Sequence, residues 1–420
     1  MTRRHSPAVY RRRRIAVGAL LLVLVMTATY FPVALLAPVP AAAAELTASE
    51  PLITPATALS TPAQGTSAIA LPGEGDDPAG LVLGASGSTD PVPIASITKT
   101  VTALVVLDAM PITDGGQGPD LTMTDQDAAF LAQTIAVGGS WASVYPGQVL
   151  SERQVIEIMM LESANNYSLT LTTWAFGSVE AYLAAATTWL ADRGLTGTTV
   201  VDTSGLDPGS RSTAHDLLVL GALATADPVL GAIVATASDT LPQLGQIDNT
   251  NDLLGTAGID GVKTGTTDEA GYCLLFAAEV AAGDRLVQVV GVVLGAPTEQ
   301  ALQASVLALL QSAAGGFQTV QLATAGEVLG SYTTAWGDTA DIVAAEDVRA
   351  TVWSAVEATR SVDAEALESG ASGTEVGTAR FTVTGVSLDG PELTVPVELG
   401  DALDGADAGW RLANPGRLFG

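Results

Sequence analysis

Two blocks of strand-like sequence at opposite ends of a helical stretch constrain this fold more than any other feature. Residues 66–71 and 80–86 are expected to form two short strands, and residues 259–296 contain further segments of alternating or continuously apolar sequence. Residues 120–240 between these blocks have mainly helical spacing. Strands that bracket helices in this way must meet in one sheet, so the expected class is α+β, with an antiparallel sheet flanked by helices.

A change in the pattern of apolar and polar residues after residue 316 predicts a second domain. Residues 317–420 contain short alternating strands, the last two joined by an Asp389-Gly390 turn. We expect a small all-β C-terminal domain there and a larger domain over residues 66–316. Residues 45–65 are rich in Pro, Ala and Thr and lack periodicity, which predicts a linker.

The N-terminus carries a targeting signal. Six arginines and no acidic residue precede Ile15, and an apolar run follows that ends in small residues near residue 44. This pattern is typical of a signal peptide, but the run is long enough for an uncleaved membrane anchor, and both interpretations stay open. Either one places the rest of the chain outside the cytoplasm, in the cell envelope or secreted.

The charge and the cysteine content exclude several classes of function. Without residues 1–44, 11 basic and 45 acidic side chains remain, a formal charge of −34. Such a surface argues against binding to nucleic acid or to an anionic membrane surface. Cys273 is the single cysteine, so no internal disulfide can form, and its apolar neighbours predict a buried side chain.

Lysine is almost absent from the sequence. Only Lys99 and Lys263 occur among 420 residues, and Lys99 follows Ser96 in an S-x-x-K pattern at the start of an expected helix. Residues three apart share a helix face, so the amine of Lys99 can reach the serine oxygen. Burial, with Lys263 as a second cation nearby, would lower the pKa of Lys99 and leave it neutral. The pattern predicts a nucleophilic Ser96 that Lys99 activates as a base.

The sequence lacks the residues that other catalytic mechanisms would need. Beyond the basic N-terminus, His215 is the only histidine and Cys273 the only cysteine, so a His/Cys zinc site is excluded. A Ser-His-Asp triad would need His215, and no G-x-S-x-G elbow accompanies it. We therefore expect neither a metal nor a cofactor. By itself S-x-x-K is a weak signal that also suits a capped surface helix, but the scarcity of lysine and the apolar neighbours favour an active site.

Two further short motifs follow Ser96 along the chain. Ser163 and Asn165 form S-x-N after a helix end, which in isolation would suit a capping turn. Lys263, Thr264 and Gly265 form K-T-G at the start of an expected strand. The glycine allows another backbone to approach closely, and the lysine offers a point charge for a substrate carboxylate.

S-x-x-K, S-x-N and K-T-G in this order are the motifs of penicillin-binding proteins and class A β-lactamases. Together with "PIASITKTVTALVVL" and "GIDGVKTGTTDEAGYCLLFAA", they make the sequence resemble the D-alanyl-D-alanine carboxypeptidases, the low-molecular-mass penicillin-binding proteins. The resemblance runs from about residue 66 to the C-terminus. It implies a serine hydrolase that trims peptidoglycan stem pentapeptides, that binds β-lactams covalently, and whose catalytic domain is residues 66–316.

The resemblance also implies a role for each motif residue. Ser96 resembles the acylated nucleophile, Lys99 its base and Ser163 the proton relay toward the leaving amine. The resemblance implies substrate-binding roles for the Asn165 side chain and for four residues of the expected strand, Lys263, Thr264, Gly265 and Thr266. Among these, Thr266 would complete the oxyanion hole with the backbone N–H of Ser96, and Lys263 with Thr264 would hold the terminal carboxylate.

The sequence departs from the family pattern at three places, and alternatives stay open. Glu162 stands where many relatives carry lysine, Asn166-Tyr167 replaces Asp-Ala, and Thr266 stands where histidine is frequent. A serine β-lactamase of the same fold is one alternative, disfavoured because no glutamate lies between Glu180 and Glu269 to activate water. A non-catalytic wall-binding or β-lactam-sensing relative is another, and endopeptidase or transpeptidase activity would use the same acyl-enzyme.

Overall fold

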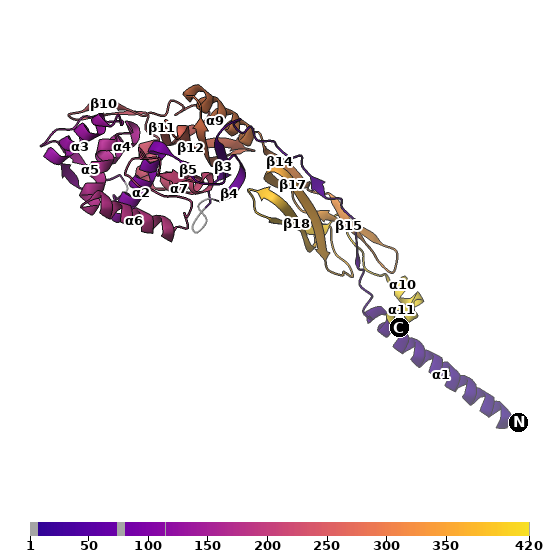
Figure 1. Ribbon diagram of the computed structural model, residues 1–420. Coiled ribbons are helices and arrows are strands. Elements are labelled where there is room, and N and C mark those ends of the chain that lie inside the picture. The colour runs from indigo at the N-terminus through magenta and orange to yellow at the C-terminus, as the bar shows by residue number, and fades with distance from the viewer. Residues whose placement is uncertain (1–6, 74–79, 114, 420) are drawn as a thin grey trace. The chain divides into compact units, whose positions relative to one another are not determined.

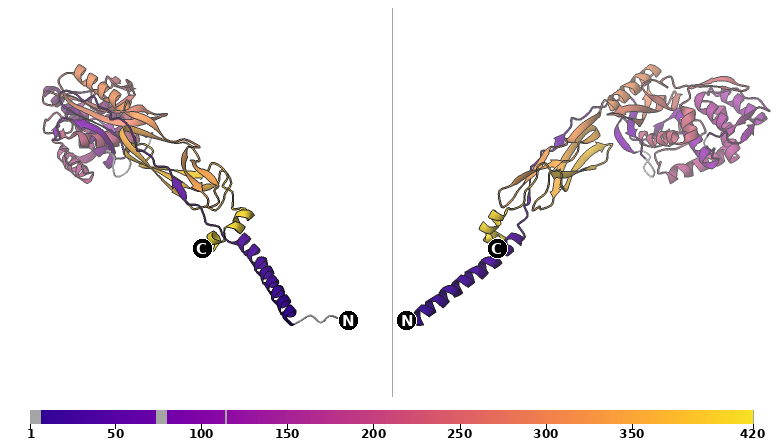
Figure 2. Two further views of the ribbon diagram at one scale, coloured as in Figure 1. Left: turned by 90° about the vertical axis from the view of Figure 1, so that its right-hand side faces the viewer. Right: turned by 180° about the vertical axis from the view of Figure 1, so that it is seen from behind.

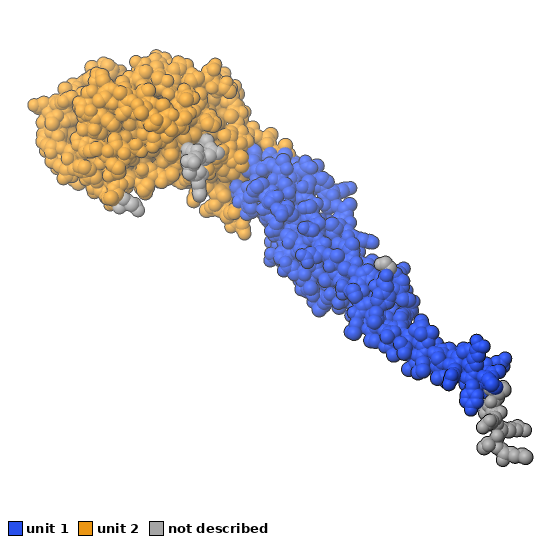
Figure 3. All heavy atoms as spheres, turned by 90° about the horizontal axis from the view of Figure 1, so that it is seen from below, with its two compact units in different colours: residues 1–55, 319–420 blue, residues 56–318 orange. Residues whose placement is uncertain are grey.

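The computed structural model describes residues 7–73, 80–113 and 115–419, and the chain divides into two compact units. One unit is Ala56–Gln318, and the other joins Met1–Pro55 to Thr319–Gly420 (Figure 3). The first part of the basic N-terminal region, residues 1–6, and most of the expected connection 72–79 lie outside the described residues.

A five-stranded antiparallel sheet forms the centre of the Ala56–Gln318 unit (Figure 1). Its strand order is β11-β12-β13-β3-β4, so strands from both ends of the unit meet, as the sequence predicts. The strands are β11 (Ile259–Thr267), β12 (Gly271–Ala282), β13 (Arg285–Ala296), β3 (Thr66–Leu71) and β4 (Leu81–Ser86). This arrangement confirms the expected α+β class, and it leaves β11 at an edge of the sheet.

Helices pack on both faces of this sheet. Alternate residues such as Leu275 and Ala277 share one core with the helices that come before β11 in sequence, and α7 contacts β12, β13 and β3. The residues between them face the other way, and α9 contacts the same strands. The helices of the unit are η1 (Ala95–Ile97), α2 (Thr98–Ala109), α3 (Asp125–Ala136), α4 (Glu152–Leu161), α5 (Asn165–Phe176), α6 (Val179–Asp192), α7 (Ala214–Ala226), α8 (Pro228–Val234) and α9 (Glu299–Ala314).

Short strand pairs complete this unit. The pairs are β5 (Val92–Pro93) with β8 (Arg211–Ser212), β6 (Asp120–Thr122) with β7 (Val149–Ser151), and β9 (Ser238–Leu241) with β10 (Gly245–Asp248). Two of them join segments far apart in the sequence, and the third, β9 with β10, is a local hairpin.

The other unit is built on an eight-stranded antiparallel sheet, as expected for an all-β region (Figure 2). The Asp389-Gly390 turn lies between β18 and β19, which pair with each other. The strands that follow residue 316 are β14 (Phe317–Ala323), β15 (Val328–Thr333), β16 (Thr339–Ala344), β17 (Val348–Ala364), β18 (Glu375–Ser387) and β19 (Glu392–Leu399). Two short helices, α10 (Ala408–Ala413) and α11 (Pro415–Leu418), come after them.

The expected linker over residues 45–65 is in part β-structure. β1 (Ala44–Leu46) pairs with β15, and β2 (Leu52–Ile53) pairs with β17. Strand pairing at a sheet edge uses main-chain groups, so a segment without side-chain periodicity can still add a strand. Residues 45–46 and 52–53 of the expected linker thus belong to paired strands.

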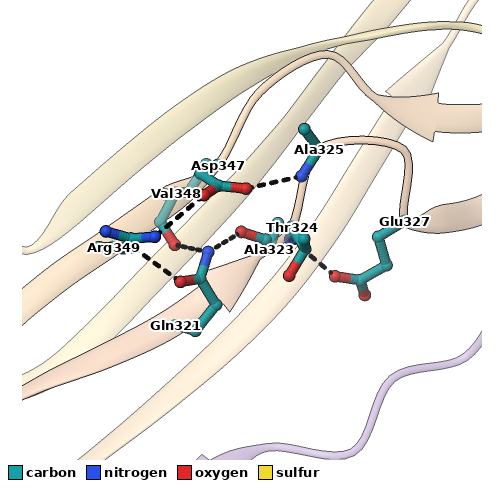
Figure 4. A network of polar contacts seen from close by, with 8 residues as sticks. All are labelled: Gln321, Ala323, Thr324, Ala325, Glu327, Asp347, Val348 and Arg349. Atoms are coloured by element: carbon teal, nitrogen blue, oxygen red, sulfur yellow. Dashed lines mark hydrogen bonds and ion pairs between the residues drawn. The ribbon is translucent and has the colours of Figure 1, made fainter.

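Polar side chains close the turn between β14 and β15 (Figure 4). The Gln321 amide donates to the carbonyls of Ala323 and Val348, and Arg349 Nε donates to Gln321 Oε1 over 2.8 Å. Asp347 accepts from the backbone of Ala325 at 2.9 Å and pairs with Arg349. The network satisfies main-chain groups that the strands leave free at their ends.

Residues of the N-terminal apolar run form the long helix α1 (Pro7–Leu36). It is long and apolar enough to cross a membrane, with a mean hydropathy of 2.3 over 18 residues. A signal sequence has the same properties, so the helix agrees with both interpretations of the sequence. In the described part of the chain, the bent pair α7 and α8 has a similar composition, but most of its side chains are buried in the larger unit.

Candidate active site

Ser96 and Lys99 meet at the start of α2. Ser96 lies in the 3-10 turn η1, and Lys99 lies one turn further along the chain. The Nζ atom of Lys99 is 2.8 Å from Ser96 Oγ, so the predicted contact is present. The same amine donates to the carbonyl oxygen of Ser204 at 3.2 Å. That second contact fixes the amine and leaves its remaining bonding direction for the serine.

The surroundings of Lys99 favour its neutral form. Its side chain is fully buried, and burial is the largest cause that lowers its pKa well below the ordinary range. The positive charge of Lys263 lowers this pKa further, as the sequence predicts, while the carboxylate of Asp202 raises it. A neutral amine at hydrogen-bond distance from a hydroxyl can accept its proton.

Lys263 lies on the edge strand β11 with its side chain buried. Burial lowers the pKa of its amine to about 7. Its Nζ is 3.4 Å from the hydroxyls of Thr250 and Thr264, which are 2.7 Å from each other. The group offers one cation and two hydroxyls, a suitable set for a carboxylate. Thr250 was missed from the sequence, because nothing in "IDNTND" indicates that it lies beside Lys263.

Gly265 brings β11 against the turn that carries Ser96. A Cβ at this position would lie 2.8 Å from the carbonyl oxygen of Ile94 and 3.1 Å from the backbone nitrogen of Ser96. Only a glycine fits so close, which agrees with the approach expected from the sequence. One residue further, Thr266 is exposed at the sheet edge and pairs with Tyr272 on its inner side.

Ser163 and Asn165 lie in the turn between α4 and α5. Ser163 is buried and has a φ of +55°, a conformation that costs energy for any residue except glycine. The backbone of Asn165 donates to Ser140 O at 2.8 Å, and its buried Oδ1 has no hydrogen-bond partner within the described ranges. In the same ranges the Ser163 hydroxyl makes no hydrogen bond to either lysine. A strained turn with an unpaired buried acceptor is typical of a binding site.

Sequence reasoning also missed the loop that supports Lys99. Asp202 accepts hydrogen bonds from Gly205 N at 2.7 Å, Asp207 N at 3.0 Å and Ser210 Oγ at 2.9 Å. These bonds fold the turn that presents the Ser204 carbonyl to Lys99. A backbone carbonyl gives no sequence signal of its partner.

The family model described as D-alanyl-D-alanine carboxypeptidase matches residues 62–298, more than half of the chain. The chain belongs to this family. D-alanyl-D-alanine carboxypeptidase DacC of Escherichia coli is 32% identical over 229 residues, which cover 54% of this chain and 56% of DacC. A D-alanyl-D-alanine endopeptidase of Pseudomonas aeruginosa is 31% identical over 192 residues, 44% of this chain and 58% of the relative. The matches thus span less than two thirds of these relatives.

Solved structures show the same fold. Penicillin binding protein 5 from Haemophilus influenzae has a TM-score of 0.55 at 21% identity, covering 83% of this chain and 98% of that one. The Streptomyces K15 DD-transpeptidase has a TM-score of 0.53 at 23% identity, covering 62% of this chain and 98% of that one. Both likenesses support the α+β fold.

Proposed function

We propose that this protein is a serine D-Ala-D-Ala carboxypeptidase that removes the terminal D-alanine from peptidoglycan stem pentapeptides. The observation that carries the proposal is the 2.8 Å contact between Ser96 Oγ and the amine of Lys99, whose pKa is lowered by burial and by Lys263. Membership of the carboxypeptidase family supports the same reaction. β-Lactams, which resemble the terminal dipeptide, would acylate the same serine.

The first half of the reaction forms an acyl-enzyme. Ser96 Oγ bonds to the carbonyl carbon of the penultimate D-alanine, and its proton passes to Lys99 Nζ. The C–N bond to the terminal D-alanine then breaks, and the proton held by Lys99 passes through the Ser163 hydroxyl to the leaving nitrogen. D-Alanine departs, and the rest of the peptide stays on Ser96 as an ester.

The second half releases the peptide. A water molecule attacks the ester carbonyl while Lys99 Nζ takes one of its protons. The bond to Ser96 Oγ breaks, and the proton returns from Lys99 to the serine. The products are the tetrapeptide and the free enzyme, so no cofactor is consumed.

Substrate binding is assigned to β11 and to the turn opposite it. The terminal carboxylate lies against Lys263, Thr264 and Thr250, and its charge raises the pKa of Lys263 again. The edge of β11 pairs with the extended peptide backbone, and Asn165 Oδ1 accepts an N–H of the substrate. The backbone N–H groups of Ser96 and Thr266 stabilise the oxyanion.

A β-lactamase is the less favoured reading of the same motifs. The nearest glutamate after Ser163 is Glu180, which lies exposed at the N-terminus of α6 and offers no contact with Ser96. Without a buried glutamate to activate water, the acyl-enzyme formed with a β-lactam should persist. The buried and hydrogen-bonded lysines argue against a non-catalytic wall-binding role. Endopeptidase and transpeptidase reactions would share the acyl-enzyme, and substrate choice separates them.

We also propose that the protein acts outside the cytoplasm and is attached to the membrane or secreted through residues 1–44. The arginine-rich start and the apolar helix α1 support this location. Peptidoglycan substrates are found in the same compartment.

Release of D-alanine from a synthetic pentapeptide ending in D-Ala-D-Ala tests the activity. We expect turnover by the native chain and a loss of at least about a thousandfold in Ser96→Ala, because the nucleophile is gone. Ser369→Ala, which changes an exposed serine of the other unit, is the matched control and should keep full activity. Equal activity of the two variants would refute the assignment of Ser96.

A further inference from the structure

The segment after β19 contacts the end of α1. The Tyr30 hydroxyl donates to the carbonyl of Leu412 at 2.6 Å, and the Arg411 guanidinium donates to the carbonyl of Ala37. Helix α10 packs beside α1, so the C-terminal end of α1 and the last residues of the chain lie together within this unit (Figure 2). Nothing in the proposed reaction requires these contacts.

The same segment also contacts the loop between β15 and β16. The Trp410 ring lies 5.5 Å from that of Trp336 in an edge-on arrangement, and Trp336 Nε1 donates to the carbonyl of Asp404 at 2.8 Å. Arg417 donates to the carbonyl of Ala335 at 3.0 Å. We call the group formed by Tyr30, Trp336, Trp410, Arg411, Arg417 and Phe419 the collar. The collar links the end of α1 to the β-sheet.

An apolar surface lies next to the collar. A depression of about 410 Å³ is lined only by Pro and apolar side chains, Pro32, Val33, Leu36, Ala37, Pro38 and Phe419. Leu36 is 83% exposed and Phe419 is 54% exposed. Large apolar groups side by side with tryptophan, tyrosine and arginine are typical of residues at a membrane–water boundary.

The sequence of α1 places the collar at that boundary. No charged residue occurs between Arg14 and Glu45. A helix that starts to cross at Ile15 and rises about 1.5 Å per residue passes through a hydrocarbon core of about 30 Å after about 20 residues. Tyr30 thus falls in the outer part of the hydrocarbon core, and Leu36 with the rest of the collar falls at its outer surface.

The segment that a signal peptidase would cut is part of the fold. Ala42 is buried and exchanges both backbone hydrogen bonds with Leu367, over 2.8 and 3.0 Å. Val39 is buried as well, and β1 begins at Ala44. Cleavage near residue 44 would remove Tyr30, which contacts Leu412, and Ala37, which accepts from Arg411.

We propose that α1 is retained as a transmembrane anchor and that the collar sits in the outer face of the phospholipid bilayer. This rests on the proposed extracytoplasmic location. Tyr30, Leu36 and Phe419 enter the acyl-chain boundary, while the tryptophans and the arginines lie at the depth of the headgroups. Because the rest of the exported chain is strongly acidic, apolar burial and not charge attraction holds the collar in the lipid.

Tryptophan quenching by brominated lipid tests the position of the collar. The full chain, purified in detergent, is returned to phosphatidylcholine vesicles with and without bromine on the acyl chains. We expect quenching, and a loss of about half of it or more in Trp336→Phe with Trp410→Phe, because these side chains are assigned to the boundary. Trp141→Phe changes an exposed tryptophan of the other unit and is the control. Equal quenching in the two variants, or none in the native chain, overturns the proposal.

Two further readouts separate possible failures. The intact mass of the protein from its own membranes should include α1, and extraction should need detergent and not high salt. A mass that lacks residues before 45 would overturn retention. Penicillin acylation of the same samples reports the active site independently, so a lost acylation with preserved quenching would refute the proposed function and not the collar.

Discussion

At the scale of single residues, the central feature is a buried amine that has only neutral contacts. Lys99 reaches the Ser96 hydroxyl and the Ser204 carbonyl, and the charges of Lys263 and Asp202 act on its pKa in opposite directions. Because the base works only when neutral, acylation should speed up as pH rises through the lowered pKa of Lys99. The balance between the two charges therefore sets the pH range of the enzyme.

Asp202→Asn tests this balance. Asparagine keeps the size of the side chain and its carbonyl acceptor but removes the charge that raises the pKa of Lys99. The pKa of Lys99 should fall, so the acylation rate should rise over a lower range of pH. This rise is the acidic limb of the plot of rate against pH. Stopped-flow measurements with a chromogenic β-lactam would record the limb. Asp192→Asn, an exposed site in the same unit, should leave it in place. A limb that moves to higher pH would contradict the assigned electrostatics.

The buried carboxyl of Glu152 leads to a second prediction, about the stability of the fold. Glu152 is fully buried at the start of α4, neither carboxylate oxygen has a partner within the described ranges, and burial raises its pKa to about 7. When folding raises the pKa of a carboxyl, its contribution to stability is fully present at pH values below its unfolded-state pKa of 4.5. This contribution is lost as the pH rises through the folded-state pKa of about 7.

Glu152→Gln should therefore stabilise the protein at pH 8 by about 1–2 kcal/mol, since a neutral amide costs less to bury than a carboxylate. Denaturant unfolding at pH 5 and pH 8 would measure the change, with little or no gain at pH 5. Glu299→Gln, at the exposed first residue of α9, is the matched control. A gain of the same size at both pH values would show that the carboxyl does not titrate as described.

At the scale of elements, the edge strand β11 has to lie directly against the turn that carries Ser96. Gly265 makes this contact possible, since a Cβ would lie 2.8 Å from Ile94 O. Gly265→Ala should push the strand away from Ser96 and lower kcat/KM for D-alanine release by about tenfold or more, because a shift of even 1 Å misplaces the reacting groups. Steady-state kinetics measure the loss. Gly405→Ala, where a Cβ meets nothing closer than 3.8 Å, should be neutral. An active Gly265→Ala enzyme would argue against substrate binding along β11.

The elements also show how far sequence reasoning reaches. The strands 66–71 and 259–296, the helix after Ser96 and the Asp389-Gly390 turn could all be predicted, because periodicity and turn chemistry are local signals. Thr250 beside Lys263 could not, and neither could the Ser204 carbonyl beside Lys99, since both are brought there by tertiary packing. The pairing of β1 and β2 was missed for a related reason, as main-chain hydrogen bonds leave no side-chain pattern.

At the scale of the whole molecule, the chain divides into two compact units with separate cores. Calorimetry of the full chain should therefore show two unfolding transitions. Penicillin should raise only the transition of the unit that contains Ser96, because a ligand stabilises the unit to which it is attached. In Ser96→Ala neither transition should move. One transition that shifts as a whole would mean that the units unfold together.

The most direct test of the account is the intact mass of the protein over time with excess penicillin, with consumption of the drug followed in parallel. We predict a persistent adduct of one drug molecule that maps to Ser96, with slow release, because the sequence has no glutamate between Glu180 and Glu269 that could activate water as in a class A β-lactamase. Rapid loss of the drug without an adduct would identify a β-lactamase. No adduct and no loss of the drug would contradict the account at its centre, because the contact of Lys99 with Ser96 would then be structural and not catalytic.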